Sequence, residues 1–354
     1  MTMKKISKTT RNNLIMIIVI IAVYALCQIM ISAGSMSNLM KGLLVPICYY
    51  SILAVSLNLT VGILGELSLG HAGFMCIGAF SGAFFSKCFV NIIDNTFIRF
   101  TLAILIGALI AAAFGALIGV AVLRLRGDYL AIVTLAFGEI VKNVVNVLYI
   151  GVDDKGMHFS TENVMALNLS EGGKVIVNGA QGISDIPRNT TFTIALILLV
   201  IIYIIISNLI NSRSGRAIMA IRDNRIAAES VGIDITKFKL LAFSLSAAMA
   251  GVAGVLYSHN LSTLTATPKN FGYNQSIMIL VFVVLGGIGN IRGSIIAALV
   301  LTLLPEYLRF MQDYRMLVYA LVLIVMMIFN WNPKCIAWRK KYSIKGLLAK
   351  KKEA

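Results

Sequence analysis

Long apolar stretches recur along the whole chain, and they constrain its fold more than any other feature of the sequence. About ten of them occur, at about residues 14–33, 42–62, 70–88, 97–123, 129–150, 191–210, 240–258, 273–289, 294–310 and 316–331. Most approach the roughly 20 residues that a helix needs to cross the hydrocarbon core of a bilayer. Alternating strands of the barrel type are absent from the sequence. We therefore expect an all-α, polytopic membrane protein of about ten transmembrane helices.

Composition narrows the class of protein further. Hydrophobic residues make up 58% of the chain and charged residues only 13%, against about 25% in an average soluble domain. The net charge of +16 could suggest a nucleic-acid partner. However, the basic residues lie in the connections between apolar stretches, where membrane proteins carry them on the cytoplasmic side. We expect contact with membrane lipid and no nucleic-acid partner.

The distribution of charge predicts the topology. Loop 211–239 has six basic and three acidic residues, whereas loop 151–190 has five acidic and three basic residues. Both ends of the chain are basic, and an even number of spans places them together in the cytoplasm, with loop 211–239 inside and loop 151–190 outside. Residues 1–340 are then one transmembrane domain. Residues 341–354 form a basic cytoplasmic tail, expected near anionic lipid headgroups.

Loop 211–239 carries local signals for a helix. Asp223 or Asn224 can cap a helix that begins just after it, and Gly232 is placed to end that helix in a left-handed conformation. Asp234 or Thr236 can then start the next transmembrane helix. The sequence therefore predicts a short cytoplasmic helix held between two membrane spans.

The side chains of this helix suit a docking surface. Ala227 and Ala228 allow another surface to approach closely, and three arginines can meet carboxylates or carbonyls of a partner, namely Arg216, Arg222 and Arg225. The alternative is a solvated basic loop that only sets the topology. The caps, the alanine pair and the glycine stop favour a docking helix, because topology alone would not require them.

Ionisable residues also lie within apolar sequence, where they are costly. The stretch "GELSLGHAGF" holds Glu66, Ser68 and His71 among several glycines. One interpretation is a broken helix that lines a solute path, and the other is a tight turn between helices. Glu139 and Lys142 are three residues apart on one helix face. They form either a structural ion pair or part of the same path.

The stretch "SLSAAMAGVAGVL" has small residues four apart, Ala247 with Gly251 and Ala250 with Gly254. Small residues at this spacing let helices pack closely in lipid. The contact is either internal or made with another subunit, and the sequence leaves both open.

Several stretches together resemble one family. "SRSGRAIMAIRDNRIAAESVGI", "GELSLGHAGFMCIGAF", "RGDYLAIVTLAFGEIV" and "LVFVVLGGIGNIRGSIIAAL" are similar to segments of the inner-membrane permeases of ABC importers of the branched-chain amino acid family, most closely of the LivM type. "VNGAQGI" is a weaker match. "AAESVG" resembles the core of the coupling motif of ABC permeases, although Ile226 stands where that motif usually has a glutamate.

The resemblance implies a subunit that imports leucine, isoleucine and valine by alternating access, without being an enzyme. It implies three kinds of partner outside this chain: a homologous LivH-type permease, two ABC ATPases that bind ATP and Mg, and an extracytoplasmic solute-binding protein. Arg216, Arg222, Arg225, Ala227, Ala228 and Gly232 would couple to the ATPases. The sequence itself has no G-x-x-x-x-G-K-[ST] loop, so no cofactor and no metal are expected in this chain.

Other functions stay open at this point. Related permeases carry urea, short amides or other amino acids, and the motifs do not separate these cargos. An ion-coupled transporter would use buried carboxylates, for which only Glu66 and Glu139 qualify. An intramembrane enzyme is least favoured, because H-E-x-x-H and G-x-S-x-G are both absent from the sequence.

Overall fold

The computed structural model describes residues 8–122, 125, 127–154, 156–170, 172–309 and 314–331. The chain divides into two compact units, 1–299 and 300–354, and the first unit holds every site described below. The long helices are α1 (Lys8–Ser32), α2 (Asn38–Asn58), α3 (His71–Cys88), α4 (Thr96–Val122), α5 (Asp128–Val147), α6 (Phe192–Asn211), α9 (Ile235–Ser258), α11 (Tyr273–Gly286), α12 (Ile291–Tyr307) and α13 (Arg315–Trp331). The basic tail 341–354 lies outside the described residues.

Each predicted apolar stretch coincides with one of these helices, and the prediction of a helical, multi-pass membrane protein is confirmed. Among the described residues, six helical stretches are long and apolar enough to cross a membrane, namely Ile15–Ser32, Asn38–Leu64, Thr96–Val122, Asp128–Val147, Phe192–Asn211 and Ile235–Ser258. The other four helices are shorter or less apolar, so the number of ten spans stays a prediction.

Helices α3, α4 and α9 form the tightly packed centre of the first unit. Glycines permit this packing: a Cβ atom on Gly78 would lie 2.3 Å from the Cα atom of Gly251, and one on Gly254 would lie 2.1 Å from the Met75 carbonyl oxygen. A Cβ on Gly251 would likewise lie 2.6 Å from the Cβ of Ala111. The small residues predicted to pack in lipid therefore make an internal contact.

The chain is broken between α2 and α3. Helix α2 continues into a π-helical stretch, Leu59–Leu64, which ends at Gly65 in the left-handed region with φ of 80°. Residues 65–70 are non-helical, and α3 begins at His71. Glycine is required at Gly65 because a side chain in that conformation would be strained. The structure thus shows an interruption between two buried helices, and a role of this break in a solute path stays a prediction.

Loop 151–190 contains a small sheet that the sequence did not predict. Strands β1 (Tyr149–Asp153), β2 (Gly156–Ser160) and β3 (Lys174–Asn178) form an antiparallel sheet in the order β2-β1-β3. Asp153 organises the loop, because its carboxylate accepts hydrogen bonds from the backbone of Gly156 and Ser170, each at 3.1 Å. The all-α prediction thus holds for the membrane body, while this loop adds strands to it.

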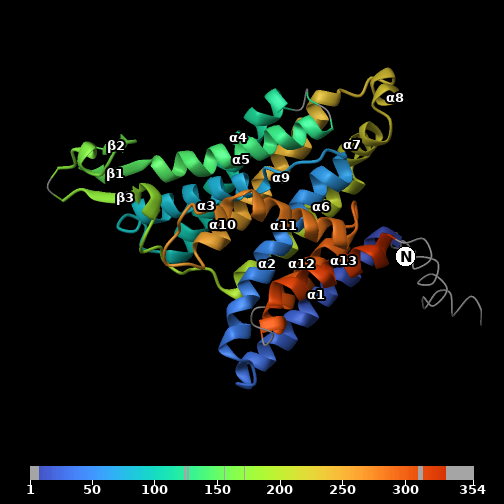
Figure 1. The fold of residues 1–354 in the computed structure, drawn as a ribbon, viewed down its shortest axis with the longest axis horizontal. Helices are drawn as coiled ribbons and strands as arrows, with labels where there is room; N and C mark the ends of the chain where they lie inside the picture. Colours follow the sequence, from blue (N-terminus) through green and yellow to red (C-terminus); the bar gives the residue numbers. More distant parts are fainter. Residues whose placement is uncertain are drawn as a thin grey trace, which may run out of the picture. The chain divides into compact units, whose positions relative to one another are not determined.

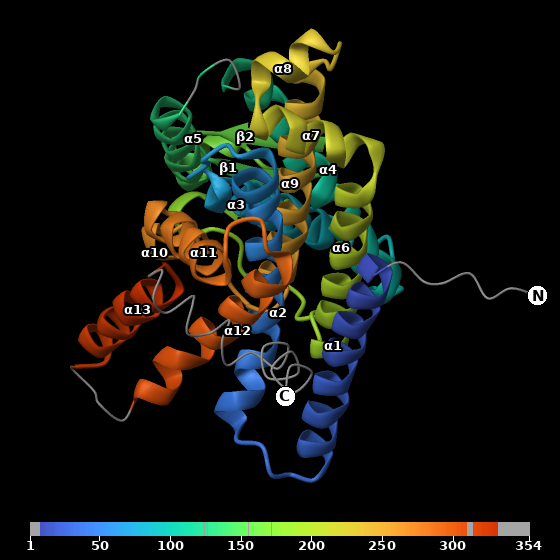
Figure 2. The same ribbon diagram turned by 90° about the vertical axis from the view of Figure 1, so that its right-hand side faces the viewer.

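Loop 211–239 lies at the other end of the long helices. It contains α7 (Arg213–Asp223) and α8 (Arg225–Ser230). In Figure 1 the sheet and α8 lie at opposite ends of α5 and α9, and Figure 2 again shows α7 and α8 together at one end. Loops on opposite sides of a membrane require such a separation, and the assignment of loop 211–239 to the cytoplasm stays a prediction.

Candidate functional site

The segment between α6 and α9 is held by side-chain caps. The Ser212 hydroxyl caps α7 by accepting from the Gly215 backbone at 3.1 Å. The Asn224 side chain caps α8 by accepting from Ala227 N at 3.1 Å, and Asp234 caps α9 at 3.0 Å through Lys237 N. Of the paired alternatives in the sequence, Asn224 and Asp234 are the caps. We call residues 213–233 the coupling segment.

The coupling segment has two helices where the sequence predicted one. Asn224 adopts an extended conformation, with φ of −155° and ψ of 104°, and this separates α7 from α8. Helix α7 is amphipathic, with Gly215, Ile218 and Ile221 buried. The signal for it was present in the Ser212 cap and in the spacing of the two isoleucines, but the many charges obscured it.

Gly232 ends α8 as predicted. Its φ is 83°, and the next residue, Ile233, donates its backbone N–H to the Ala228 carbonyl at 3.1 Å. This bond satisfies a carbonyl that the helix end would leave open. A Cβ on Gly232 would meet nothing within 4 Å. Glycine is therefore favoured here by the backbone conformation and not by a lack of space for a side chain.

The two alanines of α8 face different ways. Ala228 is buried against Ile221 and Ile235, so its small side chain serves packing within the protein. The expectation that it admits a partner is corrected by this contact. Ala227 is exposed and lies beside two large apolar side chains, Ile226 with an exposed fraction of 81% and Val231 with 74%. We call these three exposed residues of α8 and its C-cap, Ile226, Ala227 and Val231, the apolar outer face of α8; Glu229 and Ser230 are also exposed there.

Two of the three predicted arginines, Arg216 and Arg222, have hydrogen-bond partners within the chain. Arg216 donates from Nη1 to the Asn211 carbonyl at the end of α6, at 3.0 Å. Arg222 donates from Nη1 to the Gly62 carbonyl at 2.9 Å, and its Nε and Nη2 both reach Asp223 Oδ1. The Arg222 side chain therefore joins α7 to the π-helical stretch before the α2–α3 break.

A polar cavity of about 330 Å³ lies beneath the coupling segment. It is lined by Leu64, Gly65, Glu66, Gly127, Ile221, Arg222, Arg225 and Lys239. Glu66 forms an ion pair with Lys239 on the first turns of α9. Sequence reasoning missed Lys239 as the partner of Glu66, because the two residues are 173 positions apart and no local spacing connects them.

Most other polar groups at the α2–α3 break have hydrogen-bond partners, and Ser68 is the exception. The Ser56 hydroxyl donates its single proton to the Leu53 carbonyl at 2.9 Å, so it accepts from His71 Nε2 at 2.7 Å. Thr134 Oγ1 accepts from Leu69 N at 3.0 Å. Ser68 is buried, and its hydroxyl has no hydrogen-bond partner among the described residues.

The predicted ion pair between Glu139 and Lys142 is present on α5. The other carboxylate oxygen of Glu139, Oε1, accepts a hydrogen bond from the backbone N–H of Tyr273 at 2.8 Å. Tyr273 is the first residue of α11. A carboxylate at a helix N-terminus is favourable because the free N–H groups there carry partial positive charge. Glu139 therefore connects α5 to α11 as well as neutralising Lys142.

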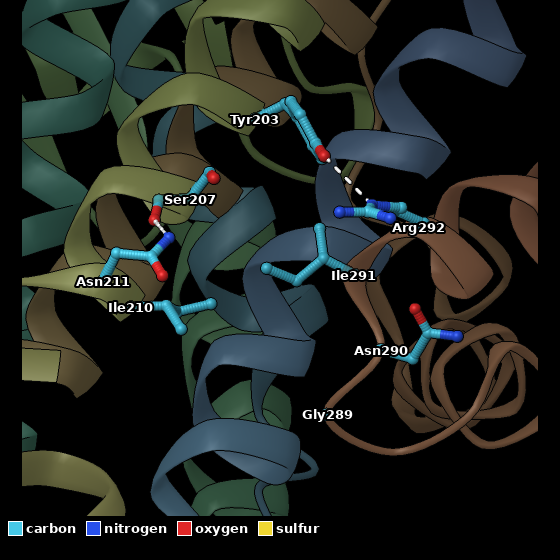
Figure 3. A pocket seen from close by; sticks show the side chains of 8 residues that line it. All are labelled: Tyr203, Ser207, Ile210, Asn211, Gly289, Asn290, Ile291 and Arg292. Carbon is cyan, nitrogen blue, oxygen red and sulfur yellow. Dashed lines mark hydrogen bonds between the residues drawn. The ribbon is translucent and has the colours of Figure 1, made fainter. Parts of the chain in front are cut away.

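A second cavity, of about 200 Å³, adjoins the end of α6. Figure 3 shows its lining: Tyr203, Ser207, Ile210 and Asn211 from α6, and Gly289, Asn290, Ile291 and Arg292 from the turn before α12 and its first residues. Arg292 donates from Nε to the Tyr203 hydroxyl at 3.4 Å. Gly289 also donates its backbone N–H to the Asn58 side chain at 2.8 Å. This glycine-rich turn thus holds α2 against α12.

Comparison with known proteins agrees with this arrangement. Residues 39–327 match the family described as branched-chain amino acid transport system / permease component. The chain belongs to this permease family. It is 35% identical over 294 residues to the high-affinity branched-chain amino acid transport system permease protein LivM of Salmonella typhimurium, covering 80% of this chain and 67% of the relative. The LivM protein of Escherichia coli is 36% identical with the same coverage.

More distant similarity extends to sugar permeases. The fructose import permease protein FruG of Bifidobacterium longum is 26% identical over 294 residues, covering 82% of this chain and 79% of the relative. No solved structure matches.

The family match and the two LivM relatives together identify the chain as a transport subunit, a multi-pass inner-membrane permease of the ABC type. Its resemblance to the branched-chain amino acid family is confirmed.

Proposed function

We propose that this permease imports leucine, isoleucine and valine by alternating access, driven by ATP that partner subunits hydrolyse. Support for the cargo comes from the similarity to the two LivM proteins, which exceeds that to the sugar permease. In this proposal Mg and ATP bind in the partners. The complex contains two ABC ATPases, a homologous LivH-type permease and a solute-binding protein outside the membrane.

The observation that carries the mechanism is the apolar outer face of α8. Ile226 and Val231 are largely exposed on a capped helix that lies beyond the ends of the membrane spans. Exposed apolar side chains of this kind mark a contact surface. We propose that an ATPase covers this face, with Arg225 near its rim, and that both termini lie on the same cytoplasmic side.

The solute path is proposed to pass the α2–α3 break. Ser68, His71 and Glu66 lie there, and the buried Ser68 hydroxyl is available to a polar group of the solute. The pair of Glu139 and Lys142 continues the path on α5, where its two charges suit a zwitterionic amino acid. A docked binding protein would deliver the solute at loop 151–190.

The docking face can be tested with Ile226→Asp and Ala227→Arg. Each introduces a charge into the proposed apolar contact, so we expect the ATPase subunits to bind at least about tenfold more weakly, a loss typical of a central interface residue. The measurement is co-purification of the ATPases with tagged permease, together with ATP-driven uptake in the same membranes.

The matched control is Met165→Asp. Met165 has an exposed fraction of 88% in the loop on the opposite side, so the same change there should leave ATPase binding intact. Full ATPase binding by both α8 variants would contradict the proposed docking face, provided that the unmodified permease binds ATPases.

A further inference from the structure

We propose that Glu66, Lys239 and Arg222 form a latch that transmits movement of the coupling segment to the α2–α3 break. The proposal rests on the proposed function, because it assumes that ATPases move α8. It adds a positioning role for three residues that lie away from the docking face. The latch has two connections, the Glu66–Lys239 ion pair and the hydrogen bond from Arg222 to the Gly62 carbonyl.

The first connection joins α7 to the residues just before the break. Arg222 is directed by Asp223, whose Oδ1 accepts from both Nε at 3.0 Å and Nη2 at 2.9 Å. Its Nη1 is thereby left to bond the Gly62 carbonyl. The aliphatic part of Arg222 also packs on Gly65, where a Cβ atom would lie only 2.5 Å from Arg222 Cγ. Displacement of α7 therefore pushes directly on this backbone.

The second connection joins the start of α9 to the first residue after Gly65. Lys239 and Glu66 have side-chain exposed fractions of only 6% and 15%. Separation of such a pair leaves charges in a poorly solvated site, which is strongly unfavourable. The two residues should consequently move together when α9 moves. Residues 67–70 connect Glu66 to His71 at the start of α3, so the movement reaches α3.

The cavity beneath the coupling segment gives this latch room to act. Glu66, Lys239 and Arg222 all line the same space of about 330 Å³. Ile221, Ala228 and Ile235 pack α7, α8 and the start of α9 into one apolar cluster. These elements therefore shift together, and the cavity provides volume for that shift. The polar connections across the cavity are then the route by which such a shift reaches the break.

The test measures solute transported per ATP hydrolysed, using the complete importer in proteoliposomes. Glu66→Gln removes the ion pair, and Arg222→Met removes the guanidinium while keeping the stem against Gly65. Each should lower the transport-to-hydrolysis ratio by roughly tenfold, the upper range for coupling residues, while ATPase binding stays normal. The exposed carboxylate Glu162 supplies the control, and Glu162→Gln should keep the wild-type ratio.

The reversed pair Glu66→Lys with Lys239→Glu separates coupling from simple stability. We expect the double variant to transport more solute per ATP hydrolysed than either single variant, Glu66→Lys or Lys239→Glu. An unchanged ratio in Glu66→Gln or in Arg222→Met, or a reversed pair that recovers nothing, would overturn the latch. If the unmodified importer hydrolyses ATP without ATP-dependent uptake, the proposed function itself fails, which is a different result. If Glu66→Gln does not assemble, Arg222→Met decides the matter alone.

Discussion

Gly232 shows how one residue determines the end of α8. Its φ of 83° is unfavourable for most residues with a side chain, although a Cβ there would have free space. Asparagine tolerates this left-handed conformation, whereas a β-branched residue costs about 1–2 kcal/mol there. Gly232→Val should therefore weaken ATPase binding by up to about tenfold, and Gly232→Asn should not. The measurement is the apparent Kd for the ATPase subunits; equal affinities for the two variants would argue against a role for this backbone conformation.

At the same scale, the sequence predicted local chemistry well and distant partners poorly. The caps Asn224 and Asp234 and the stop at Gly232 depend on residues a few positions away, and each is found in the structure. Neither the burial of Ala228 nor the pairing of Glu66 with Lys239 follows from local spacing. Both depend on how α7, α8 and α9 meet in space, which hydropathy and capping signals do not specify.

At the scale of elements, the packing of α3 on α9 depends on backbone contact. A methyl group on Gly78 would lie 2.3 Å from both the Cα atom and the carbonyl oxygen of Gly251, so the helices must separate to admit it. Gly78→Ala should reduce stability by about 1–3 kcal/mol, the usual cost of overpacking. Gly42→Ala is the matched control, because a Cβ on Gly42 meets nothing within 4 Å in α2 and alanine favours a helix.

The measurement for this pair is the Tm of the purified permease in detergent. We expect the Gly78 variant to melt at a lower temperature than the parent and the Gly42 variant to melt at the same temperature or higher. A Gly78 variant as stable as the parent would mean that α3 and α9 do not approach as closely as the structure indicates.

The helices with a membrane-spanning apolar pattern and the capped helix α8 were predictable from the sequence, whereas α7 and the strands were not. The long helices follow the apolar stretches because length and hydropathy alone mark them. Strands β1 to β3 escaped prediction, since each has five residues and its pairing depends on segments separated by turns. Helix α7 was not predicted because only three of its residues are buried, Gly215, Ile218 and Ile221, which gives a weak apolar pattern.

At the scale of the whole molecule, the central claim is ATP-driven import of branched-chain amino acids. The most direct measurement is uptake of labelled leucine, isoleucine, valine and urea by cells that lack this chain and by complemented cells, before and after ATP depletion with the membrane potential held constant. The account predicts that uptake of the three amino acids requires both the chain and ATP. Uptake that survives ATP depletion and follows the membrane potential would contradict it, and a response of urea alone would contradict the proposed cargo.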